Sequence, residues 1–337
     1  MPAATPGRSA WSTRARTPTR SAGCPASSAP ERATRPRTTG RIPEMSTIAF
    51  IGLGIMGSPM AVHLQQAGHA VVGFNRTPEK TGPLVEAGGT AASSIAEAVA
   101  DADVVAVMVP DSPDVVDVLT GADGVFAGAG PGTLIIDFST IRPDVTAELA
   151  EQAREKGLRL LDAPVSGGEA GAKNAALSIM VGGSAEDFAA ARPVLDVVGR
   201  TVVHVGPSGS GQTVKAANQL MVAGNIALLA EAIVFLEAYG VDTSAAVEVL
   251  GGGLAGSAVL NQKAQKMLDR SFEPGFRIEL HHKDLGILTS AAREAGVVAP
   301  VGALVAQLMA SAKASGDAGL DHSGLFSTIE RLSGRTS

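Results

Sequence analysis

One stretch decides the fold of this 337-residue chain: Ile48-Ala49-Phe50-Ile51-Gly52-Leu53-Gly54-Ile55-Met56-Gly57. A short apolar run opens into G-x-G-x-x-G and then into a helix-like segment, residues 58–68, whose Pro59 falls in the first turn, where its missing N–H is harmless. A strand, a glycine turn and a helix in this order let backbone N–H groups approach a pyrophosphate at the helix N-terminus. A second apolar run, residues 70–74, follows. We therefore predict a dinucleotide-binding loop, rather than a purely structural turn, made of Gly52, Leu53, Gly54, Ile55, Met56 and Gly57.

Composition narrows the class of protein. Apolar residues make up 45% of the chain but aromatic residues only 3%, so the core must consist mostly of Ala, Val, Leu and Ile. The net charge is −6, but residues 1–44 carry eight Arg and two Glu, which leaves the remainder close to −12. An acidic body gives no reason to expect a nucleic-acid partner, and we expect no apolar run of the ~18 residues that a membrane span needs. We therefore expect a cytoplasmic protein without a membrane partner.

The N-terminal segment, residues 1–44, is a different kind of sequence, rich in Arg, Ser, Thr, Pro and Ala. It resembles a transit segment, a disordered interaction arm, or upstream sequence translated from a misassigned start. We favour the last interpretation, with Met45 as the true initiator, and exclude the segment from the fold. The single cysteine, Cys24, lies here, so neither a disulfide framework nor a cysteine metal site can form within one chain.

From residue 45 onward, apolar runs alternate with helix-like segments, as in a parallel sheet with helices on both faces. Beyond residue 208 the alternation of apolar runs and helix-like segments ends. Gln212–Tyr239 is expected to form one long helix that links two domains. Everything after it has a helical pattern. We therefore predict an α/β Rossmann-type NAD(P)-binding domain over 45–208 and an all-α domain for substrate binding and oligomerisation over 209–337. The further strands are expected at residues 103–110, 133–140, 159–164, 176–181 and 202–205.

Cofactor choice is predicted from the residues after the second strand, Asn75-Arg76-Thr77. A site that prefers NAD usually has Asp or Glu here, to bind the ribose 2′-hydroxyl. A neutral Asn75 and a cationic Arg76 would instead accept a 2′-phosphate. We therefore expect NADP(H) to be favoured and NAD(H) to be possible; the alternative is that Arg76 is a solvated surface residue. The strand end at Val109 and Pro110 is expected to contact the cofactor as well.

A second glycine motif, Ser166-Gly167-Gly168, follows the strand-like run 159–164. Ligands of open α/β sheets bind at the carboxyl ends of the strands. Two consecutive glycines leave backbone N–H groups accessible to an anion, and Ser166 adds a hydroxyl. The motif suits a substrate carboxylate, although an ordinary turn between strand and loop explains the local sequence equally well.

A third motif, Gly209 to Asn218, begins the long helix. Lys215 and Asn218 are three residues apart and share one helix face. The neighbours of Lys215 are apolar or small, which indicates a partly buried face. A desolvated lysine has a lowered pKa and can exchange a proton near neutral pH. We therefore consider Lys215 a candidate catalytic group, against the alternative of an ordinary surface lysine.

Other titratable residues are weaker candidates. His281-His282 falls at an expected helix start, but adjacent histidines on a helix do not face one another, so we predict no metal site. Lys283 could reach the cofactor from the second domain. Asp137 and Asp162, at strand ends, are expected to form turns rather than an acid–base pair.

Together these motifs resemble the β-hydroxyacid dehydrogenase family, through residues 52–57, 162–168, 209–218 and Lys283-Asp284-Leu285. The resemblance spans about residues 46–333. It implies that Lys215 is the catalytic lysine and Asn218 its hydrogen-bonding companion. It further implies that Ser166, Gly167 and Gly168 hold a substrate carboxylate, and that Thr140 and Lys283 contact the nicotinamide end of the cofactor.

Residues 252–257, 274–281 and 321–323 are similar to members of this family that reduce 2-hydroxy-3-oxopropanoate to D-glycerate. Relatives often have Asp where this chain has Asn75, which favours NADPH over NADH here. The alternatives are a 3-hydroxyisobutyrate dehydrogenase or another semialdehyde reductase of the family, an imine reductase, which lacks the lysine, and a non-catalytic dinucleotide-binding scaffold. The presence of both Lys215 and Asn218 disfavours the last two. A homodimer or homotetramer through the helical domain is expected.

Overall fold

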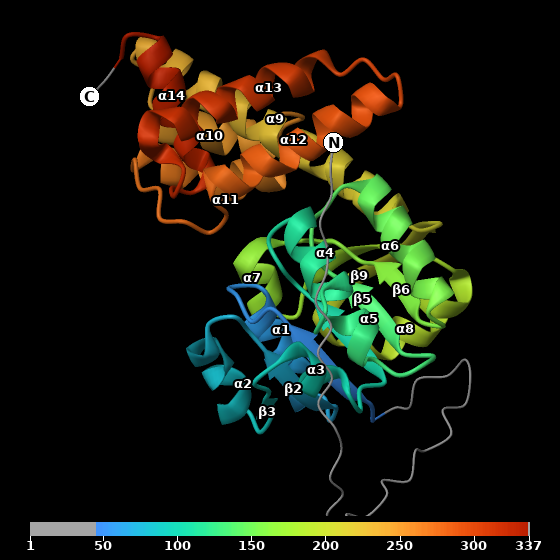
Figure 1. The fold of residues 1–337 in the computed structure, drawn as a ribbon. Coiled ribbons are helices and arrows are strands. Elements are labelled where there is room, and N and C mark those ends of the chain that lie inside the picture. Colours follow the sequence, from blue (N-terminus) through green and yellow to red (C-terminus); the bar gives the residue numbers. More distant parts are fainter. Residues whose placement is uncertain (1–44, 336–337) are drawn as a thin grey trace, which may run out of the picture. The chain divides into compact units, whose positions relative to one another are not determined.

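A computed structural model of the protein describes residues 45–335 (Figure 1). The segment expected to lie outside the fold, residues 1–44, is outside the described residues, as is Cys24. The interpretations of that segment therefore stay predictions.

Within the described residues, nine strands form one sheet in the order β3-β2-β1-β4-β5-β6-β8-β7, and β9 also pairs with β8. The glycine-rich loop follows the central strand β1, which lies between β2 and β4. The strands are β1 Thr47–Ile51, β2 Ala70–Phe74, β3 Thr90–Ala91, β4 Val104–Val107, β5 Leu134–Asp137, β6 Arg159–Asp162, β7 Val165–Ser166, β8 Leu177–Gly182 and β9 Gly199–Gly206.

The sheet is mixed, which corrects the expectation of an all-parallel sheet. Strands β1 to β6 are parallel. Strand β8 runs antiparallel to both β6 and β7, and β9 is parallel to β8. The chain reverses over the short strand β7 and the glycines after it instead of crossing over through a long helix, and only a crossover returns a strand in the parallel sense.

Helices cover both faces of the sheet, because its central strands are apolar on both sides. Ile48 and Phe50 of β1 belong to one core, and Ala49 and Ile51 to the other. The first core is covered by α1 Gly57–Gln66, α2 Gly82–Glu86, α7 Gly168–Lys173 and α8 Ala185–Val198. The second is covered by α3 Ile95–Val99, α4 Ser112–Thr120, α5 Val125–Gly128 and α6 Pro143–Glu155. A 3₁₀ turn, η1 Pro78–Thr81, precedes α2.

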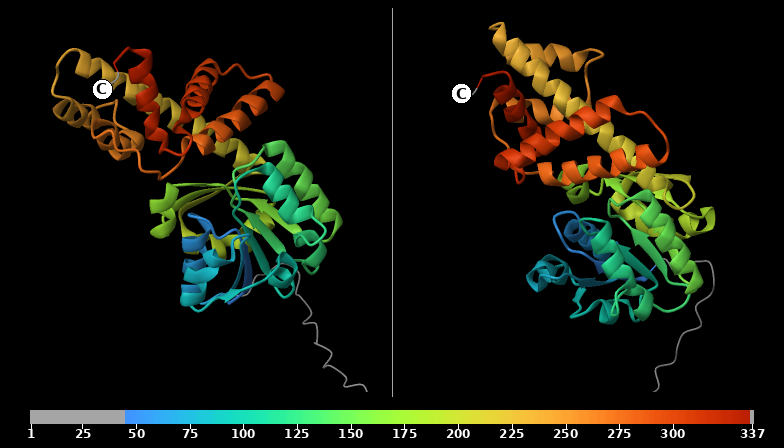
Figure 2. Two further views of the ribbon diagram at one scale, coloured as in Figure 1. Left: turned by 60° about the vertical axis from the view of Figure 1, so that its left-hand side comes forward. Right: turned by 45° about the horizontal axis from the view of Figure 1, so that its top comes forward.

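The rest of the described chain is helical and is built around α9 Ser210–Ala238, which leads out of the sheet domain into the helical domain (Figure 2). The chain thus has the predicted architecture, a Rossmann-type α/β domain joined by a long helix to an all-α domain. Around α9 lie α10 Thr243–Gly252, α11 Ala258–Leu268, α12 Ile278–Glu294, α13 Pro300–Ala312, η2 Lys313–Asp317, η3 His322–Gly324 and α14 Leu325–Leu332.

Helix α9 also corrects the expectation about apolar runs. By length and composition it is apolar enough to cross a membrane. It is at the same time the central helix of the helical core, where Ala223, Ile226, Ala230 and Ile233 are fully buried. Such a core helix passes the same test, so the finding is weak evidence for a membrane span.

Candidate active site

The glycine-rich loop has the geometry that a dinucleotide requires. Gly52 has a φ of +99°, and a Cβ there would lie 2.2 Å from the carbonyl oxygen of Met108. A Cβ on Gly57 would lie 2.0 Å from the carbonyl oxygen of Gly52. A Cβ on Gly54 would meet nothing within 4 Å. Packing therefore requires the first and third glycines, whereas the middle one leaves the backbone open to a ligand, as pyrophosphate binding demands.

Asn75 holds this loop from the end of β2. Its Oδ1 accepts a hydrogen bond from the backbone N–H of Leu53 at 2.9 Å, and its Nδ2 donates to the carbonyl oxygen of Thr77 at 2.9 Å. The Arg76 side chain is mostly exposed, and its guanidinium lies 3.1 Å from a carboxylate oxygen of Asp114. Asn75 is thus bonded to the loop, whereas the Arg76 side chain extends into solvent.

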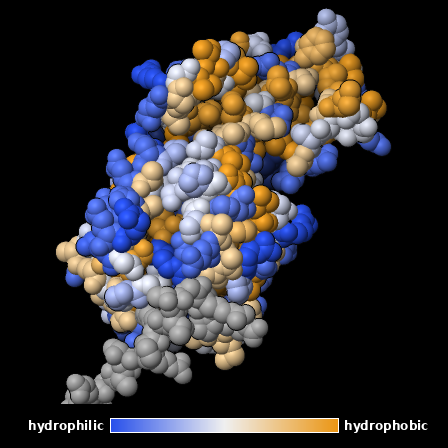
Figure 3. All heavy atoms as spheres, turned by 90° about the vertical axis from the view of Figure 1, so that its right-hand side faces the viewer, coloured by the Kyte–Doolittle hydropathy of each residue, from blue (hydrophilic) through white to orange (hydrophobic). Residues whose placement is uncertain are grey.

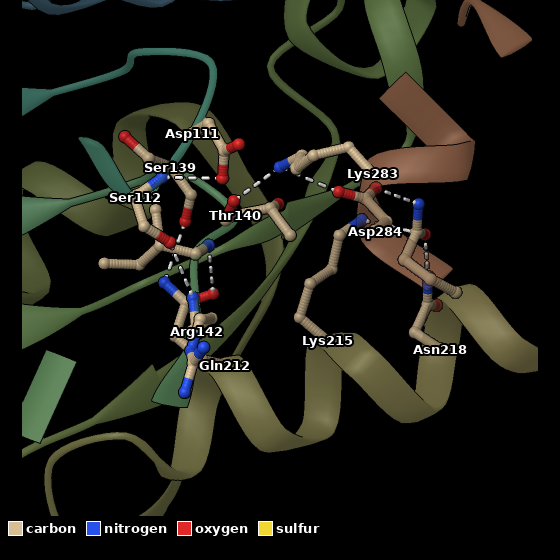
Figure 4. Close-up of polar contacts among 12 residues, drawn as sticks. Asp111, Ser112, Ser139, Thr140, Arg142, Gln212, Lys215, Asn218, Lys283 and Asp284 are labelled. Carbon is tan, nitrogen blue, oxygen red and sulfur yellow. Dashed lines mark hydrogen bonds and ion pairs between the residues drawn. The ribbon is translucent and has the colours of Figure 1, made fainter. Parts of the chain in front are cut away.

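The loop after β5, residues 138–142, is fixed by hydrogen bonds from two sides. Gln212 of α9 accepts from the backbone N–H of Ile141 at 3.1 Å and donates to the carbonyl oxygen of Ser139 at 2.8 Å. The Ser139 hydroxyl accepts from the backbone N–H of Val109 at 3.0 Å. This loop carries Thr140 (Figure 4). Because Ser139 also bonds to Val109, the loop connects the predicted cofactor contact at Thr140 with those at Val109 and the adjacent Pro110.

Asp162 joins the sheet to the long helix, which corrects the expectation that it only forms a turn. Its two carboxylate oxygens accept from the backbone N–H groups of Gly209 and Gln212, at 2.9 and 3.0 Å. A Cβ at Gly211 would lie 2.7 Å from the Asp162 carboxylate. The N-terminus of α9 is therefore fastened to the end of β6, one helical turn before Lys215.

Asp137, on the neighbouring strand, does form a turn. Its carboxylate accepts from the backbone N–H of Ser139 at 2.9 Å. Burial raises the pKa of the Asp137 carboxyl to about 6. It therefore supports the loop that carries Thr140 and lies beside Asp162 in the register of the sheet.

Lys215 is buried, with 6% of its surface exposed. Its ammonium donates to the carbonyl oxygen of Val165 at 2.8 Å and to Oε1 of Gln219 at 3.0 Å. Burial lowers the pKa of Lys215 to about 8, although the nearby Asp284 carboxylate acts in the opposite direction. Val165 directly precedes Ser166, so the lysine lies against the strand that leads into the second glycine motif.

The glycines of that motif adopt conformations that favour glycine. Gly167 has a φ of +136° and Gly168 a φ of +60°. A Cβ on Gly168 would meet nothing within 4 Å, so the backbone there is open on the side that a side chain would cover. Ser166 is the last residue of β7 and Gly168 the first of α7, so the motif joins this strand to that helix.

Gln219 connects Lys215 to the helical domain. Its Oε1 also accepts from Nδ2 of Asn218 at 2.9 Å, and its Nε2 donates to the Asp284 carboxylate at 2.6 Å. The family resemblance implies that Asn218 is the hydrogen-bonding companion of Lys215. In the structure the two side chains are linked through Oε1 of Gln219, to which both donate. Asp284 pairs with the ammonium of Lys283 at 2.9 Å.

Lys283 completes a continuous polar chain. Its ammonium donates to the carbonyl oxygen of Thr140 at 2.6 Å (Figure 4). Hydrogen bonds and ion pairs thus run from Lys215 through Gln219, Asp284 and Lys283 to the loop after β5. The two lysines singled out from the sequence lie at opposite ends of one network.

Behind this network lies a buried histidine pair. Nε2 of His281 is 3.2 Å from the backbone carbonyl oxygen of Gln219, and Nδ1 of His281 is 3.0 Å from Nδ1 of His322. A carbonyl only accepts, so Nε2 of His281 carries the hydrogen, and Nδ1 of His322 must donate to the other ring. His281 is the fourth residue of α12, which begins earlier than expected, at Ile278. In the described part of the chain, no group of three or more His, Cys, Asp or Glu side chains could hold a metal ion.

The sequence analysis gave no role to several residues of the site. Gln219 is four residues after Lys215, so helical spacing alone could have placed it on the same face. Asp284 follows Lys283 directly but received no role. Gln212 and His322 contact residues far away in the chain, and no local pattern points to these contacts.

Comparisons with known proteins agree with this geometry. Residues 47–206 match the family described as the NAD binding domain of 6-phosphogluconate dehydrogenase. Residues 209–329 match that described as NAD-binding of NADP-dependent 3-hydroxyisobutyrate dehydrogenase. The chain is 39% identical to the 2-hydroxy-3-oxopropionate reductase of Escherichia coli K12 over 285 residues, which cover 85% of this chain and 97% of the relative.

Solved structures give the same result. A Mycobacterium tuberculosis 3-hydroxyisobutyrate dehydrogenase, solved with L-serine, superimposes with a TM-score of 0.78 at 37% identity, covering 85% of this chain and 99% of that one. Psf3 in complex with NADP⁺ and 2-OPP has a TM-score of 0.77 at 27% identity, covering 84% of this chain and 99% of that one.

The glycine-rich loop, the Rossmann-type sheet and these similarities define an oxidoreductase that uses a nicotinamide dinucleotide. Within that class, the chain belongs to the β-hydroxyacid dehydrogenase family.

Proposed function

We propose that the protein reduces 2-hydroxy-3-oxopropanoate to D-glycerate with NADPH as the favoured cofactor, and that Lys215 is the proton donor. The observation that supports this reaction is the buried Lys215 ammonium. It lies between the second glycine motif and the polar network that runs through Gln219 to Thr140. The similarity to the E. coli reductase supports the choice of aldehyde.

The bound nicotinamide would supply a hydride to the aldehyde carbon. Lys215, as an ammonium, stabilises the negative charge that develops on the carbonyl oxygen and then gives that oxygen a proton. Burial strengthens this electrostatic interaction, because little water screens it. A pKa of about 8 leaves Lys215 mostly protonated at neutral pH while lowering the cost of proton transfer.

The substrate carboxylate would be held by the hydroxyl of Ser166 and the backbone N–H groups of Gly167 and Gly168. The open backbone at Gly168 and the direct connection of Ser166 to Val165, which accepts from Lys215, support this placement. The anion would then lie next to the ammonium, and the aldehyde of a three-carbon acid is close to its carboxylate.

Thr140 and Lys283 would contact the nicotinamide end of the cofactor. The support is the bond from Lys283 to the carbonyl oxygen of Thr140, which places both on one side of the Lys215 network. Arg76 would pair with the 2′-phosphate of NADPH, and its exposure beside the glycine-rich loop supports this role.

A substrate panel tests the proposal. The purified protein is assayed with 2-hydroxy-3-oxopropanoate, succinic semialdehyde, 3-hydroxyisobutyrate and L-serine, each with NADPH or NADH (or with the oxidised form). We expect the highest kcat/KM with 2-hydroxy-3-oxopropanoate and NADPH. A higher value with another substrate contradicts the substrate assignment, and equal values with both cofactors contradict the cofactor preference.

The second candidate is a 3-hydroxyisobutyrate dehydrogenase. The similarity to the M. tuberculosis structure favours it. Lys215 would then work in the reverse direction, as a neutral amine that accepts the hydroxyl proton. The two enzymes would share the fold and Lys215 and would differ only in the side chains of the substrate pocket. The same substrate panel therefore distinguishes them by which substrate gives the higher kcat/KM.

We also propose that residues 209–337 form the substrate and oligomerisation domain and that the protein is a homodimer or homotetramer. Met221, Leu228 and Phe235 of α9 are spaced seven residues apart, so they share one face, and each is more than 60% exposed. Figure 3 shows apolar surface gathered over the helical part of the chain. Light scattering of the wild type and of Leu228→Lys tests this, with a smaller particle expected for the variant.

A further inference from the structure

The residues on either side of the glycine-rich loop meet across it. Strands β2 and β4 are the two neighbours of β1, and the loop begins where β1 ends. Arg76 follows β2, and Asp114 lies in the first turn of α4, which follows β4. An ion pair between them, at 3.1 Å, therefore spans the carboxyl end of β1. This is the place where a dinucleotide must lie in a sheet of this topology.

Asp114 is the anionic group next to the side chain that would meet the 2′ position. The amide of Asn75 is already bonded at both ends, to Leu53 and to Thr77, so it is committed to holding the loop. Arg76 is 77% exposed and Asp114 25%. The acidic group that an NAD-preferring site has at the end of β2 is absent there, but α4 brings a carboxylate to the same guanidinium.

We propose that Asp114 is a specificity-determining residue for the dinucleotide, which limits the preference for NADPH by competing with the 2′-phosphate for Arg76. A 2′-phosphate must share the guanidinium with the carboxylate or displace it, and the two anions repel one another. A neutral 2′-hydroxyl does neither. The protein can therefore bind NADH with the ion pair intact.

This inference rests on the proposed assignment of Arg76 to the 2′-phosphate. In this role Asp114 changes the ratio of the NADPH and NADH dissociation constants and leaves NADH binding itself nearly unchanged. Removal of a negative charge is therefore expected to tighten binding of one cofactor only.

The test measures dissociation constants by fluorescence titration of NADPH and of NADH, separately, at about 0.15 M ionic strength, where charges more than ~8 Å apart are largely screened. The variant is Asp114→Asn, which keeps the size of the side chain. The matched control is Asp117→Asn, which removes the same net charge. Asp117 is exposed and lies one turn further along α4. Circular dichroism melting confirms that each variant is folded.

For Asp114→Asn we expect the NADPH dissociation constant to fall about fivefold, the size of effect that a partly exposed ion pair allows. The constant for NADH should change less than about twofold, and Asp117→Asn should leave the ratio of the two constants unaltered. An unchanged ratio in Asp114→Asn, or an equal shift in the control, overturns the proposal.

Arg76→Gln separates this inference from the proposed function. If that variant weakens NADPH binding alone while Asp114→Asn leaves the ratio unchanged, only the role of Asp114 is wrong. If Arg76→Gln weakens NADPH and NADH equally, the assignment of Arg76 to the 2′-phosphate fails as well, and the inference with it.

Discussion

Lys215 and Arg76 are the two cations predicted to meet the substrate and the cofactor, and their surroundings differ. Lys215 is buried, and its ammonium has two acceptors, one of which belongs to a network that reaches Thr140. Arg76 is exposed, and among the residues that the structure describes its ion-pair partner is Asp114. A buried, interlocked charge has a fixed position and a perturbed pKa, which suits proton transfer. An exposed charge moves freely, which suits recognition of a ligand that must enter and leave.

The sharpest test of this contrast is Lys215→Met. Removal of a general acid lowers turnover by about 10²- to 10⁴-fold, whereas NADPH binding should persist. Steady-state kinetics and fluorescence titration measure the two quantities. Lys173→Met, at an exposed lysine paired with Glu169, is the control and should retain wild-type turnover. Near-wild-type turnover in Lys215→Met would show that the mechanism is wrong.

Asp162→Asn tests how much the anchor at the N-terminus of α9, one turn before Lys215, stabilises the fold. Both carboxylate oxygens accept backbone N–H groups, and an asparagine can replace only one of them. We expect the free energy of unfolding, measured by urea denaturation, to fall by about 1–3 kcal/mol.

The matched control for this change is Asp242→Asn. Asp242 caps α10 at an exposed position and accepts both of its N–H groups with Oδ1 alone, so asparagine can replace it fully. If the two variants lose equal stability, Asp162 is an ordinary helix cap.

Asp284→Asn tests how the network sets the pKa of Lys215. The two titratable side chains that act on the pKa of Lys215 in the described structure, Asp284 and Lys283, both lie on α12. The Asp284 carboxylate raises the pKa of Lys215, so its removal lowers that pKa. Reduction requires the ammonium, so kcat/KM for reduction falls as pH rises through this pKa. The fall should move to lower pH by about one pH unit.

The pH profile of kcat/KM for aldehyde reduction is the measurement. Glu279→Gln removes a carboxylate from the first turn of the same helix, where Glu279 pairs with Arg277 at the surface, and should leave the profile in place. A loss of activity in Asp284→Asn without a shift of the profile would mean that Asp284 only supports the structure.

The smallest effect is expected for the exposed cation, Arg76. Arg76→Ala should raise KM for NADPH about fivefold more than KM for NADH, because one partly screened interaction with the 2′-phosphate is lost. Initial-rate kinetics with each cofactor give the comparison. Equal changes for both cofactors contradict the assignment.

Much of the fold could be predicted because its signals are local. The apolar runs of β1, β2 and β4 to β6, the glycines after β1 and the uninterrupted pattern of α9 each lie within one segment. The reversed strand β8 could not, since strand direction depends on how the chain turns at Ser166 to Gly168. Helix α14 was not predicted, although Leu325, Phe326 and Ile329 follow helical spacing and share its buried face.

The site was predictable to the same extent. Lys215 and Asn218 share a motif and a helix face, so their proximity followed from spacing. The bonds of Gln212 to the loop after β5, and of Asp162 to the N-terminus of α9, join residues far apart in the chain, so no local pattern indicates them. Roles for Ser166 to Gly168, Thr140 and Lys283, and the cytoplasmic location, stay predictions.

The histidine pair behind the site has a consequence for acid stability. His281 and His322 hold one hydrogen between their facing nitrogens, and burial lowers the pKa of both rings. Once the chain unfolds, each ring has an ordinary pKa of about 6.5, so below that pH the unfolded chain binds more protons than the folded one. A second proton in the folded pair would place two N–H groups face to face. Acid therefore lowers the free energy of unfolding through a histidine pair in the core of the helical domain, where His281 contacts the backbone of Gln219.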